Sequence, residues 1–227
     1  MLSLKDVRYR WPGRTSFALD IPDFSLNHAE SVLLLGESGS GKSTLLSLIC
    51  GTIATETGSI TIAGTDIATL KAGRRDRFRA EQIGLIFQQF NLLPYASALD
   101  NILLPLRFAP LRRARVPAPQ DTAKVICQKL GLPQEAVSAQ AGTLSVGQQQ
   151  RVAAARALIG APPLIIADEP TSALDAATQA TFLELLFTQV RESHGTLLMV
   201  SHDARLATHF DRVVQMSELT RPSQALT

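Results

Sequence analysis

The segment Gly36–Ser43 constrains the fold of this chain more than any other feature, because it fits the phosphate-binding pattern G-x-x-x-x-G-K-[S/T]. The apolar run Ser31–Leu35 precedes it, and the run Thr44–Cys50 follows it with a pattern that suits a helix. A glycine-rich turn in this setting points backbone N–H groups at phosphate oxygens, and the helix N-terminus adds partial positive charge. We therefore expect a nucleoside triphosphate site. The alternative is a glycine turn that only begins an ordinary helix.

The residues of this loop have separate roles in the prediction. Lys42 would reach the outer phosphates of the nucleotide, and the hydroxyl of Ser43 would complete the ligand shell of a Mg²⁺ ion. The residues expected to contact the nucleotide in this segment are Gly36, Glu37, Ser38, Gly39, Ser40, Gly41, Lys42, Ser43 and Thr44.

The composition is that of a globular protein. The chain has 227 residues, 45% of them hydrophobic, which suits one large domain or a core domain with a smaller lobe. The net charge of +2 is too small to make nucleic acid the main partner. Cys50 and Cys127 lie in apolar, helix-like settings, and we interpret them as buried thiols in a reducing compartment.

Two further observations bear on where the chain works. No uninterrupted apolar stretch reaches the ~18 residues that a membrane span needs. The first residues, Met1–Asp6, lack the apolar core of a signal peptide. We therefore expect a soluble cytosolic protein.

The order of the predicted elements indicates an α/β fold. Residues 2–26 carry β-formers on both sides of Trp11–Gly13, which predicts two strands and a turn. Short apolar runs predict further strands, and helical patterns lie at 175–193 and 203–209. These further strands are expected at Ser31–Leu35, Gly58–Gly64, Gln82–Phe87, Leu164–Ala167, Thr196–Val200 and Arg212–Met216.

Between about Ser97 and Ala141 the pattern is helical, broken by prolines, and no strand is evident. We place a helical lobe at about 88–155 and the core at about 1–87 and 156–227. The predicted fold class is α/β: a phosphate-loop NTPase with a parallel sheet core, an N-terminal antiparallel β subdomain and the inserted helical lobe. The whole chain is expected to be a single nucleotide-binding domain.

Two clusters of basic residues lie outside these motifs. One runs from Lys71 to Glu81, and the other lies among prolines at Arg107, Arg112, Arg113 and Arg115. We interpret the first as a solvated helix face and the second as an exposed loop. The alternative is a patch close to anionic lipid headgroups or to a membrane partner.

Two adjacent acids follow the predicted strand Leu164–Ala167. An acid at the carboxyl end of a buried strand lies where open α/β sheets bind ligands. Asp168 is therefore a candidate for orienting the Mg²⁺ shell, and Glu169 could polarise an attacking water. The alternative, a strand that ends in solvated acids, is weakened by the phosphate loop elsewhere in the chain.

The segment Leu144–Leu158 settles the class, since it closely resembles the signature region of ATP-binding cassette (ABC) ATPases. Ser145 and Gly147 would expose a hydroxyl and backbone N–H groups at a helix start, which makes a second anion site. The resemblance implies that Ser145, Gly147 and Gln148 of one subunit close over the phosphate loop of another. Two ATP molecules with Mg²⁺ would then lie in a two-fold dimer.

Further segments resemble the remaining family motifs in the expected order. The resemblance implies that Gln88 touches Mg²⁺ and water beside the transmembrane partner, and that His202 contacts the γ-phosphate. Ser172–Asp175 is similar to the loop that crosses the dimer interface. Trp11 matches the aromatic residue that stacks on adenine, with Tyr9 as the alternative candidate. The other interpretation is that this aromatic residue belongs to the hydrophobic core.

One position departs from the family pattern. The usual signature is Leu-Ser-Gly-Gly-Gln, whereas this chain has Val146 at the third position. A β-branched residue limits backbone torsions and adds bulk near the nucleotide. We expect reduced, but not abolished, ATP affinity in the closed dimer.

The resemblance also predicts the biological task. Phe87–Pro94, followed by Asn101–Pro105, looks most like the lipoprotein-releasing, macrolide-exporting and cell-division group. The implied function is an ATP-hydrolysing subunit that drives a separate integral membrane permease, in export or periplasmic force transmission. The alternatives are the ATPase of an amino-acid-type importer and a soluble ABC ATPase without a transport role.

This function implies a set of partners and a place in the cell. The expected partners are the permease, a second ATPase subunit in a homodimer or pseudo-dimer, and a periplasmic adaptor, with no nucleic acid. The expected location is the cytoplasmic face of the inner membrane, where the chain would be peripheral.

Overall fold

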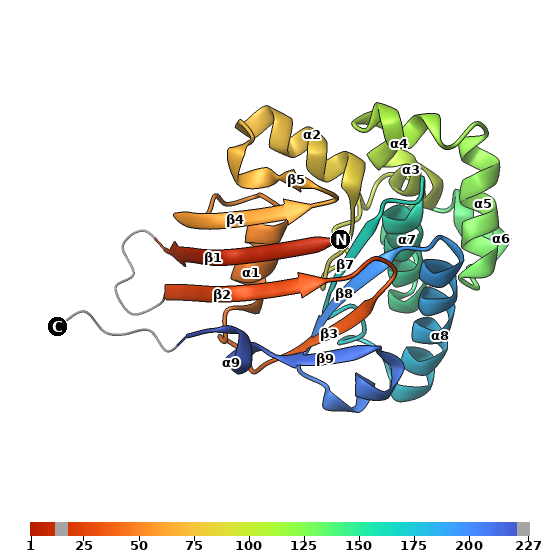
Figure 1. Ribbon diagram of the computed structural model, residues 1–227. Helices are drawn as coiled ribbons and strands as arrows, with labels where there is room; N and C mark the ends of the chain where they lie inside the picture. Colours follow the sequence, from red (N-terminus) through yellow and green to blue (C-terminus); the bar gives the residue numbers. More distant parts are fainter. Residues whose placement is uncertain (12–17, 222–227) are drawn as a thin grey trace. The chain divides into compact units, whose positions relative to one another are not determined.

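The computed structural model describes residues 1–11 and 18–221, and Figure 1 gives its elements. Two compact units make up the chain: residues 1–79 together with 198–227, and residues 80–197. The turn predicted at Trp11–Gly13 lies largely outside the described residues. Among the helices of the described part, none is long and apolar enough to cross a bilayer.

An antiparallel sheet in the first unit has the strand order β2-β1-β4-β5, and Figure 1 shows β1 between β2 and β4. Its register pairs Leu2 of β1 with Leu26 of β2 and with Ile62 of β4. All three of these side chains are buried, because the apolar positions of the strands share one face. The predicted N-terminal antiparallel β subdomain is confirmed. The strands are β1 (Leu2–Arg10), β2 (Ala18–Leu26), β4 (Thr57–Ile62) and β5 (Thr65–Asp66).

Parallel strands in the same unit carry the phosphate loop. Strand β3, Ser31–Leu35, pairs in parallel with β9, Arg212–Gln215, so that Leu35 lies opposite Gln215. Val32 to Leu34 are fully buried, as expected for a continuous apolar strand that is covered on both faces. The remaining elements of this unit are α1 (Lys42–Ile49), η1 (Ile67–Thr69), η4 (Ala204–His209), α9 (Met216–Leu219) and most of β8 (Thr196–Ser201). The helix predicted at 203–209 is therefore a 3₁₀ helix.

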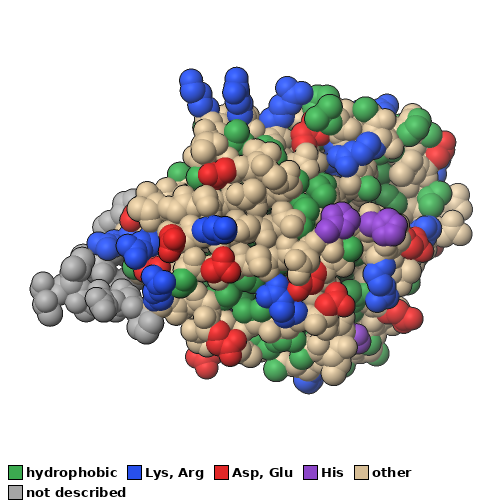
Figure 2. All heavy atoms as spheres, viewed as in Figure 1, with side chains coloured by type: hydrophobic (Ala, Val, Ile, Leu, Met, Phe, Trp, Pro, Cys, Tyr) green, Lys and Arg blue, Asp and Glu red, His purple; other side chains and the backbone are tan. Residues whose placement is uncertain are grey.

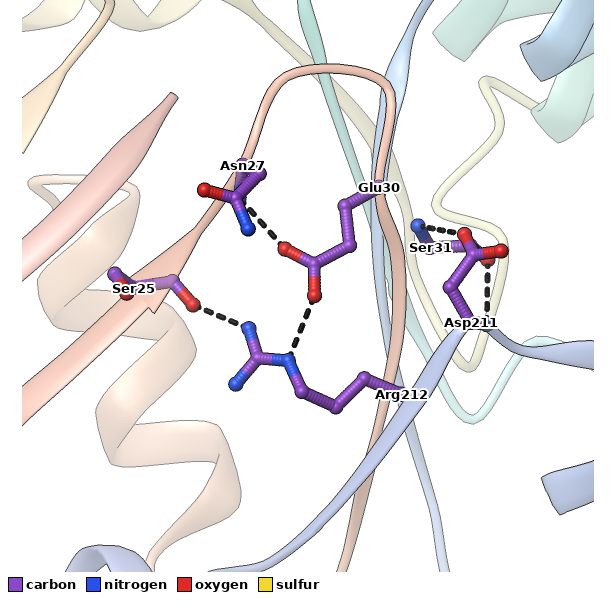
Figure 3. A network of polar contacts seen from close by, with 6 residues as sticks. All are labelled: Ser25, Asn27, Glu30, Ser31, Asp211 and Arg212. Carbon is purple, nitrogen blue, oxygen red and sulfur yellow. Dashed lines mark hydrogen bonds and ion pairs between the residues drawn. The ribbon is translucent and has the colours of Figure 1, made fainter.

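A polar network fixes the starts of β3 and β9 to each other (Figure 3). Glu30 accepts hydrogen bonds from Arg212 Nε at 2.7 Å and from the Asn27 N–H at 2.6 Å. Asp211 accepts from both the N–H and the hydroxyl of Ser31, at 2.8 and 2.6 Å. Burial alone would raise the pKa of Glu30, but the bonds from Arg212 and Asn27 outweigh it and lower the pKa. The strand that enters the phosphate loop is thus anchored at its first residue.

The second unit combines one parallel strand pair with a group of helices. Strand β6, Ile83–Ile86, pairs with β7, Leu164–Asp168, and Ile86 lies opposite Ala167. Residues 97–141 form helices and no strand of the named sheets, as the sequence predicted. The helices are α3 (Ala98–Leu103), η2 (Leu104–Arg107), α4 (Pro110–Ala114), α5 (Pro119–Lys129), α6 (Gln134–Ser138), η3 (Ala141–Thr143), α7 (Val146–Leu158) and α8 (Ala176–Glu192).

Strand β6 and helix α7 approach each other closely at Gly84. A Cβ atom at this position would lie 2.2 Å from the carbonyl oxygen of Ala157, so any side chain would push the helix away from the strand. The sheet of the second unit therefore packs directly against the backbone of the helix that begins at the signature segment.

The interpretation of the second basic cluster is wrong for Arg112. Its side chain is only 1% exposed, and Nε and Nη2 donate to the carbonyl oxygens of Ile159 and Ala157 at 2.6 and 2.7 Å. Glu81, also buried, accepts the backbone N–H groups of Leu111 and Arg112 at 3.0 and 2.7 Å. Burial lowers the pKa of Arg112 to about 10, so the guanidinium stays charged at neutral pH. This arginine ties α4 to the end of α7.

The first basic cluster behaves as the sequence predicted. It lies on α2, Ala72–Gln82, in which Glu81 is the buried residue. Arg74 and Arg77 are exposed, and Arg79 pairs with Asp76 at 2.9 Å. Figure 2 shows Lys and Arg side chains projecting along the edge of the molecule where α2 lies. This face is solvated.

Both cysteines are buried, as expected, and they form no disulfide with each other. Burial raises the pKa of the Cys127 thiol to about 11, so it stays protonated at neutral pH. Cys127 is thus a packing residue of α5.

Candidate nucleotide-binding site

The phosphate loop connects β3 to α1 through backbone conformations that need glycine. A Cβ at Gly36 would lie 2.7 Å from Ser40 Oγ and 2.9 Å from Met216 Cβ, so the turn closes only without a side chain. Gly41, which caps α1, has φ = 101°, a left-handed value that other residues adopt at a cost. Gly39 is left-handed too, with φ = 82°. The strand, loop and helix predicted around this motif are confirmed as β3 and α1.

Lys42 turns its ammonium group back into the loop. Its Nζ donates to the carbonyl oxygens of Gly36 at 2.6 Å and Glu37 at 2.7 Å, and the residue is only 7% exposed. The positive charge of Lys42 is therefore held among the backbone groups of the loop that connects β3 to α1. An anion bound there would meet the charge of Lys42 together with the N–H groups of the first turn of α1.

A pocket of about 440 Å³ opens beside this loop in the first unit. It lies where β3 and β9 end, the edge at which parallel α/β sheets bind ligands. His202, directly after β8, lines the same pocket, so the structure brings together His202, Gly36, Glu37 and Ser40. The full lining is Leu35, Gly36, Glu37, Ser40, His202, Ala204, Gln215, Met216 and Ser217.

Sequence reasoning missed five of these lining residues: Leu35, Ala204, Gln215, Met216 and Ser217. A signal was present for Gln215, Met216 and Ser217, because they stand at the carboxyl end of the strand predicted at 212–216. Leu35 lies opposite Gln215, so Gly36 and Met216 leave neighbouring strands at the same level.

The aromatic candidate Trp11 lies beside the first turn of α1. Its Nε1 donates to Thr44 Oγ1 at 3.2 Å, and its ring packs edge-on against Tyr9 with centroids 5.3 Å apart. Trp11 is 36% exposed, whereas Tyr9 is 8% exposed. Of the two aromatic residues, Trp11 therefore presents a ring surface that a ligand could cover.

The three candidates Gln88, Asp168 and Glu169 belong to the second unit, where strand register brings them to one edge. Ile86 lies opposite Ala167 in the parallel pair, so Gln88 and Glu169 leave neighbouring strands at the same carboxyl end. Gln88 is exposed, and both acids are half-buried. Glu169 has φ = 42°, a left-handed value that is uncommon for a residue with a side chain.

The signature segment begins α7 with a complete capping box. The Ser145 hydroxyl accepts from the Gln148 N–H at 3.3 Å, and the Gln148 side chain accepts from the Ser145 N–H at 2.9 Å. Val146 stands at the first helical position and is 47% exposed. A Cβ at Gly147 would meet no atom closer than 3.8 Å. Ser145, Val146 and Gly147 are thus presented together at an open helix N-terminus.

Asp175 ends the segment Ser172–Asp175 as the N-cap of α8. Its carboxylate accepts from the N–H of Thr178 at 3.0 Å and from its hydroxyl at 2.8 Å. These hydrogen bonds lower the pKa of Asp175. The last residue of this segment therefore fixes where helix α8 begins.

The fold and the loop geometry define a phosphate-loop α/β protein that binds nucleotides. A family model described as ABC transporter matches residues 19–172, well over half of the chain. The chain therefore belongs to the ABC transporter family and is an ATPase of that family, as the resemblance predicted.

Two curated relatives agree with the group that the sequence predicted. The chain is 41% identical over 195 residues to the macrolide export ATP-binding/permease protein MacB of Rhodopirellula baltica, covering 86% of this chain but only 28% of that relative. It is 39% identical over 197 residues to the lipoprotein-releasing system ATP-binding protein LolD of Syntrophotalea carbinolica, covering 86% of this chain and 85% of that relative. These relatives do not favour the amino-acid-importer alternative.

A solved structure confirms the fold. The chain is 32% identical to the bacterial ABC transporter cassette MJ0796, solved as a dimer, with a TM-score of 0.80 over 95% of this chain and 94% of that one. A post-hydrolysis state of the same cassette, bound to ADP and Pi, superposes with a TM-score of 0.78.

Proposed function

We propose that this chain is the ATP-hydrolysing subunit of a transporter, and that it binds ATP with Mg²⁺ at the loop formed by residues 36–44. The observation that carries the proposal is the ammonium group of Lys42, which is buried and directed into a glycine-rich loop that ends at a helix N-terminus. His202 lines the pocket beside that loop. The phosphates of ATP would replace the two loop carbonyls as partners of Lys42, and Trp11 would stack on the adenine.

The chemistry of the donor set fits Mg²⁺. This ion prefers oxygen ligands, keeps several waters, and is bound through one or two carboxylates together with the phosphates of the substrate. Ser43 would supply a hydroxyl, Asp168 a carboxylate and Gln88 an amide oxygen. The bound ion would neutralise negative charge on the phosphate oxygens during transfer.

Hydrolysis would be performed by residues that orient water and stabilise charge. Glu169 would hold the attacking water in line and take up its proton. His202 would hydrogen-bond the γ-phosphate, and Gln88 would hold a water close to the metal. Lys42 would counter the charge that develops on the phosphate oxygens.

We propose further that two cassettes close on two nucleotides. The open N-terminus of α7, with Ser145, Gly147 and Gln148, has the donors to meet a phosphate supplied by a partner subunit. The similarity to a cassette solved as a dimer supports this arrangement. The partner would be a second copy or a related subunit. ATP would favour the closed dimer in proportion to its preference for that state, and hydrolysis would release it.

Val146→Gly tests the departure in the signature. We expect the change to lower the concentration of ATP at half-maximal ATPase rate, since it removes a β-branched side chain that limits the approach of the helix end to the nucleotide. Steady-state ATPase measurements over a range of ATP concentrations check this. Val213→Ala on β9 provides a conservative control at an exposed position. Unchanged kinetics for Val146→Gly would contradict the proposal.

The transport task is proposed from the relatives. Their names describe macrolide export and lipoprotein release. We infer that this chain drives a separate membrane permease in export or periplasmic force transmission. It would lie peripherally at the cytoplasmic face of the inner membrane. A periplasmic adaptor would complete the assembly. We also propose that the whole chain acts as one nucleotide-binding domain, with the helical lobe at about 88–155.

Affinity capture from native membranes tests the transport role. The Glu169→Gln variant, loaded with ATP and Mg²⁺ to hold the closed state, is expected to recover an integral membrane protein. Capture with ATP omitted provides the control for the nucleotide-dependent state. Recovery of soluble proteins or nucleic acid without any membrane protein would overturn the transport role and favour the soluble alternative.

A further inference from the structure

A buried amide on helix α7 holds the backbone directly after Glu169. Gln150 is fully buried, and its Nε2 donates to the carbonyl oxygen of Pro170 at 2.6 Å. Its other amide atom, Oε1, is buried without a hydrogen-bond partner. The orientation of the amide is nonetheless fixed, since the Pro170 oxygen can only accept and must face the nitrogen. Burying an amide with one unpaired atom costs free energy of folding. The hydrogen bond that Gln150 donates to Pro170 offsets part of this cost.

A second buried side chain of α7 holds the backbone that follows Gln88. Arg156 is 8% exposed, and its Nη1 and Nη2 donate to the carbonyl oxygens of Asn91 and Phe90 at 2.6 and 2.5 Å. Burial lowers the pKa of Arg156. The planar guanidinium meets two successive carbonyls at once, which fixes the direction as well as the position of this loop.

Both loops have backbone conformations that need such support. Glu169 has φ = 42°, and Phe90 and Asn91 have φ = 59° and 49°. Left-handed values cost free energy at residues other than glycine, and they persist only where the surroundings hold them. In both loops the carbonyls bound by α7 lie at these residues or directly after them. The contacts therefore stand where the backbone would otherwise relax.

We propose that Gln150 and Arg156 are positioning residues for ATP hydrolysis, through which α7 holds the loops of Glu169 and Gln88 in their reactive geometry. Ser145 caps the start of the same helix, so α7 connects its own N-terminus to both loops within the second unit. A nucleotide that bound at that N-terminus would then affect the positions of both loops. This inference rests on the proposed roles of Glu169 and Gln88.

The test is a double-mutant cycle between Gln150→Met and Glu169→Gln. Methionine keeps the length of the side chain but cannot donate to Pro170. We expect kcat for ATP to fall by about 10-fold or more, since small misplacement of reacting groups costs up to about 100-fold, while KM changes by less than about 3-fold. In the Glu169→Gln background the same change should produce little further loss, because Gln150 acts through Glu169.

Arg156→Lys tests the second contact independently of the first. Lysine keeps the charge but cannot bind both carbonyls in one plane, so we expect a similar fall in kcat with KM little changed. Gln189→Met is the matched control, because it removes an amide that bonds Glu192 on the surface of α8, and it should leave kcat unchanged. Thermal unfolding of each variant shows whether folding is preserved.

The outcomes separate this inference from the proposed function. A Gln150→Met variant with normal kcat, or one whose loss multiplies fully with that of Glu169→Gln, overturns the positioning role. Loss of kcat and nucleotide binding together with a lowered melting temperature in both Gln150→Met and Arg156→Lys shows a purely structural role and also overturns it. Normal turnover in Glu169→Gln itself instead overturns the proposed role of Glu169.

Discussion

The Glu169→Gln variant is expected to hydrolyse ATP at least about 100-fold more slowly, because a general base typically accelerates a reaction by that factor or more. Glutamine keeps the size of the side chain, but it cannot accept the proton of the attacking water. Lys42 and the phosphate loop are untouched, so ATP should still bind. ATP-bound dimers should then accumulate. Phosphate release measures the turnover, and size-exclusion chromatography with ATP and Mg²⁺ measures the dimer.

Glu184→Gln is the matched control for this variant. Glu184 is exposed on α8, and the same change there should leave turnover unaltered. If Glu169→Gln kept near-normal turnover, Glu169 would lose the role of general base, and another residue at the carboxyl end of β6 or β7 would have to take it.

Replacing Arg112 with methionine is expected to destabilise the protein by about 3–5 kcal/mol, the range seen when one partner of a buried charged group is removed. The change leaves the carbonyl oxygens of Ile159 and Ala157 without the hydrogen bonds from this guanidinium. It also removes the positive charge that attracts the buried carboxylate of Glu81. Urea unfolding, followed by circular dichroism, measures the free energy of unfolding.

Arg107→Met provides the comparison for Arg112. Arg107 belongs to the same basic cluster but is exposed, so its loss should change the free energy of unfolding by less than about 0.5 kcal/mol. Equal effects of the two substitutions would show that the buried contacts of Arg112 add nothing to stability.

The sequence predicted most of the fold because the relevant signals are local. The phosphate loop, its strand and its helix can be recognised from glycine spacing and apolar runs. Continuous apolar residues predict strands at 164–167 and 196–200, which the structure shows as β7 and β8, each one residue longer. The resemblance to a family then supplied the order of the site residues, including His202, which shares a pocket with Gly36.

What the sequence could not predict depends on partners far along the chain. Arg112 has the local setting of an exposed loop, with charges and prolines around it, yet its acceptor at Ile159 lies 47 residues away. Gln150 and Arg156 likewise look like polar positions of an ordinary helix. They can be buried because their side chains donate to carbonyl groups, and only the folded chain brings those carbonyls close to them.

The hydrogen bonds of Lys42 to its own loop have a consequence for how tightly nucleotide would be held. A phosphate that bound at Lys42, as proposed, would not meet an unpaired charge, because it would first have to take the place of the carbonyls of Gly36 and Glu37. Binding would then exchange one set of hydrogen bonds for another, and the net gain in free energy would be smaller than the sum of the new contacts. The same exchange runs in reverse when phosphate leaves. Because the loop itself can accept the hydrogen bonds of Lys42, it would favour release of product and repeated cycles over tight retention of nucleotide.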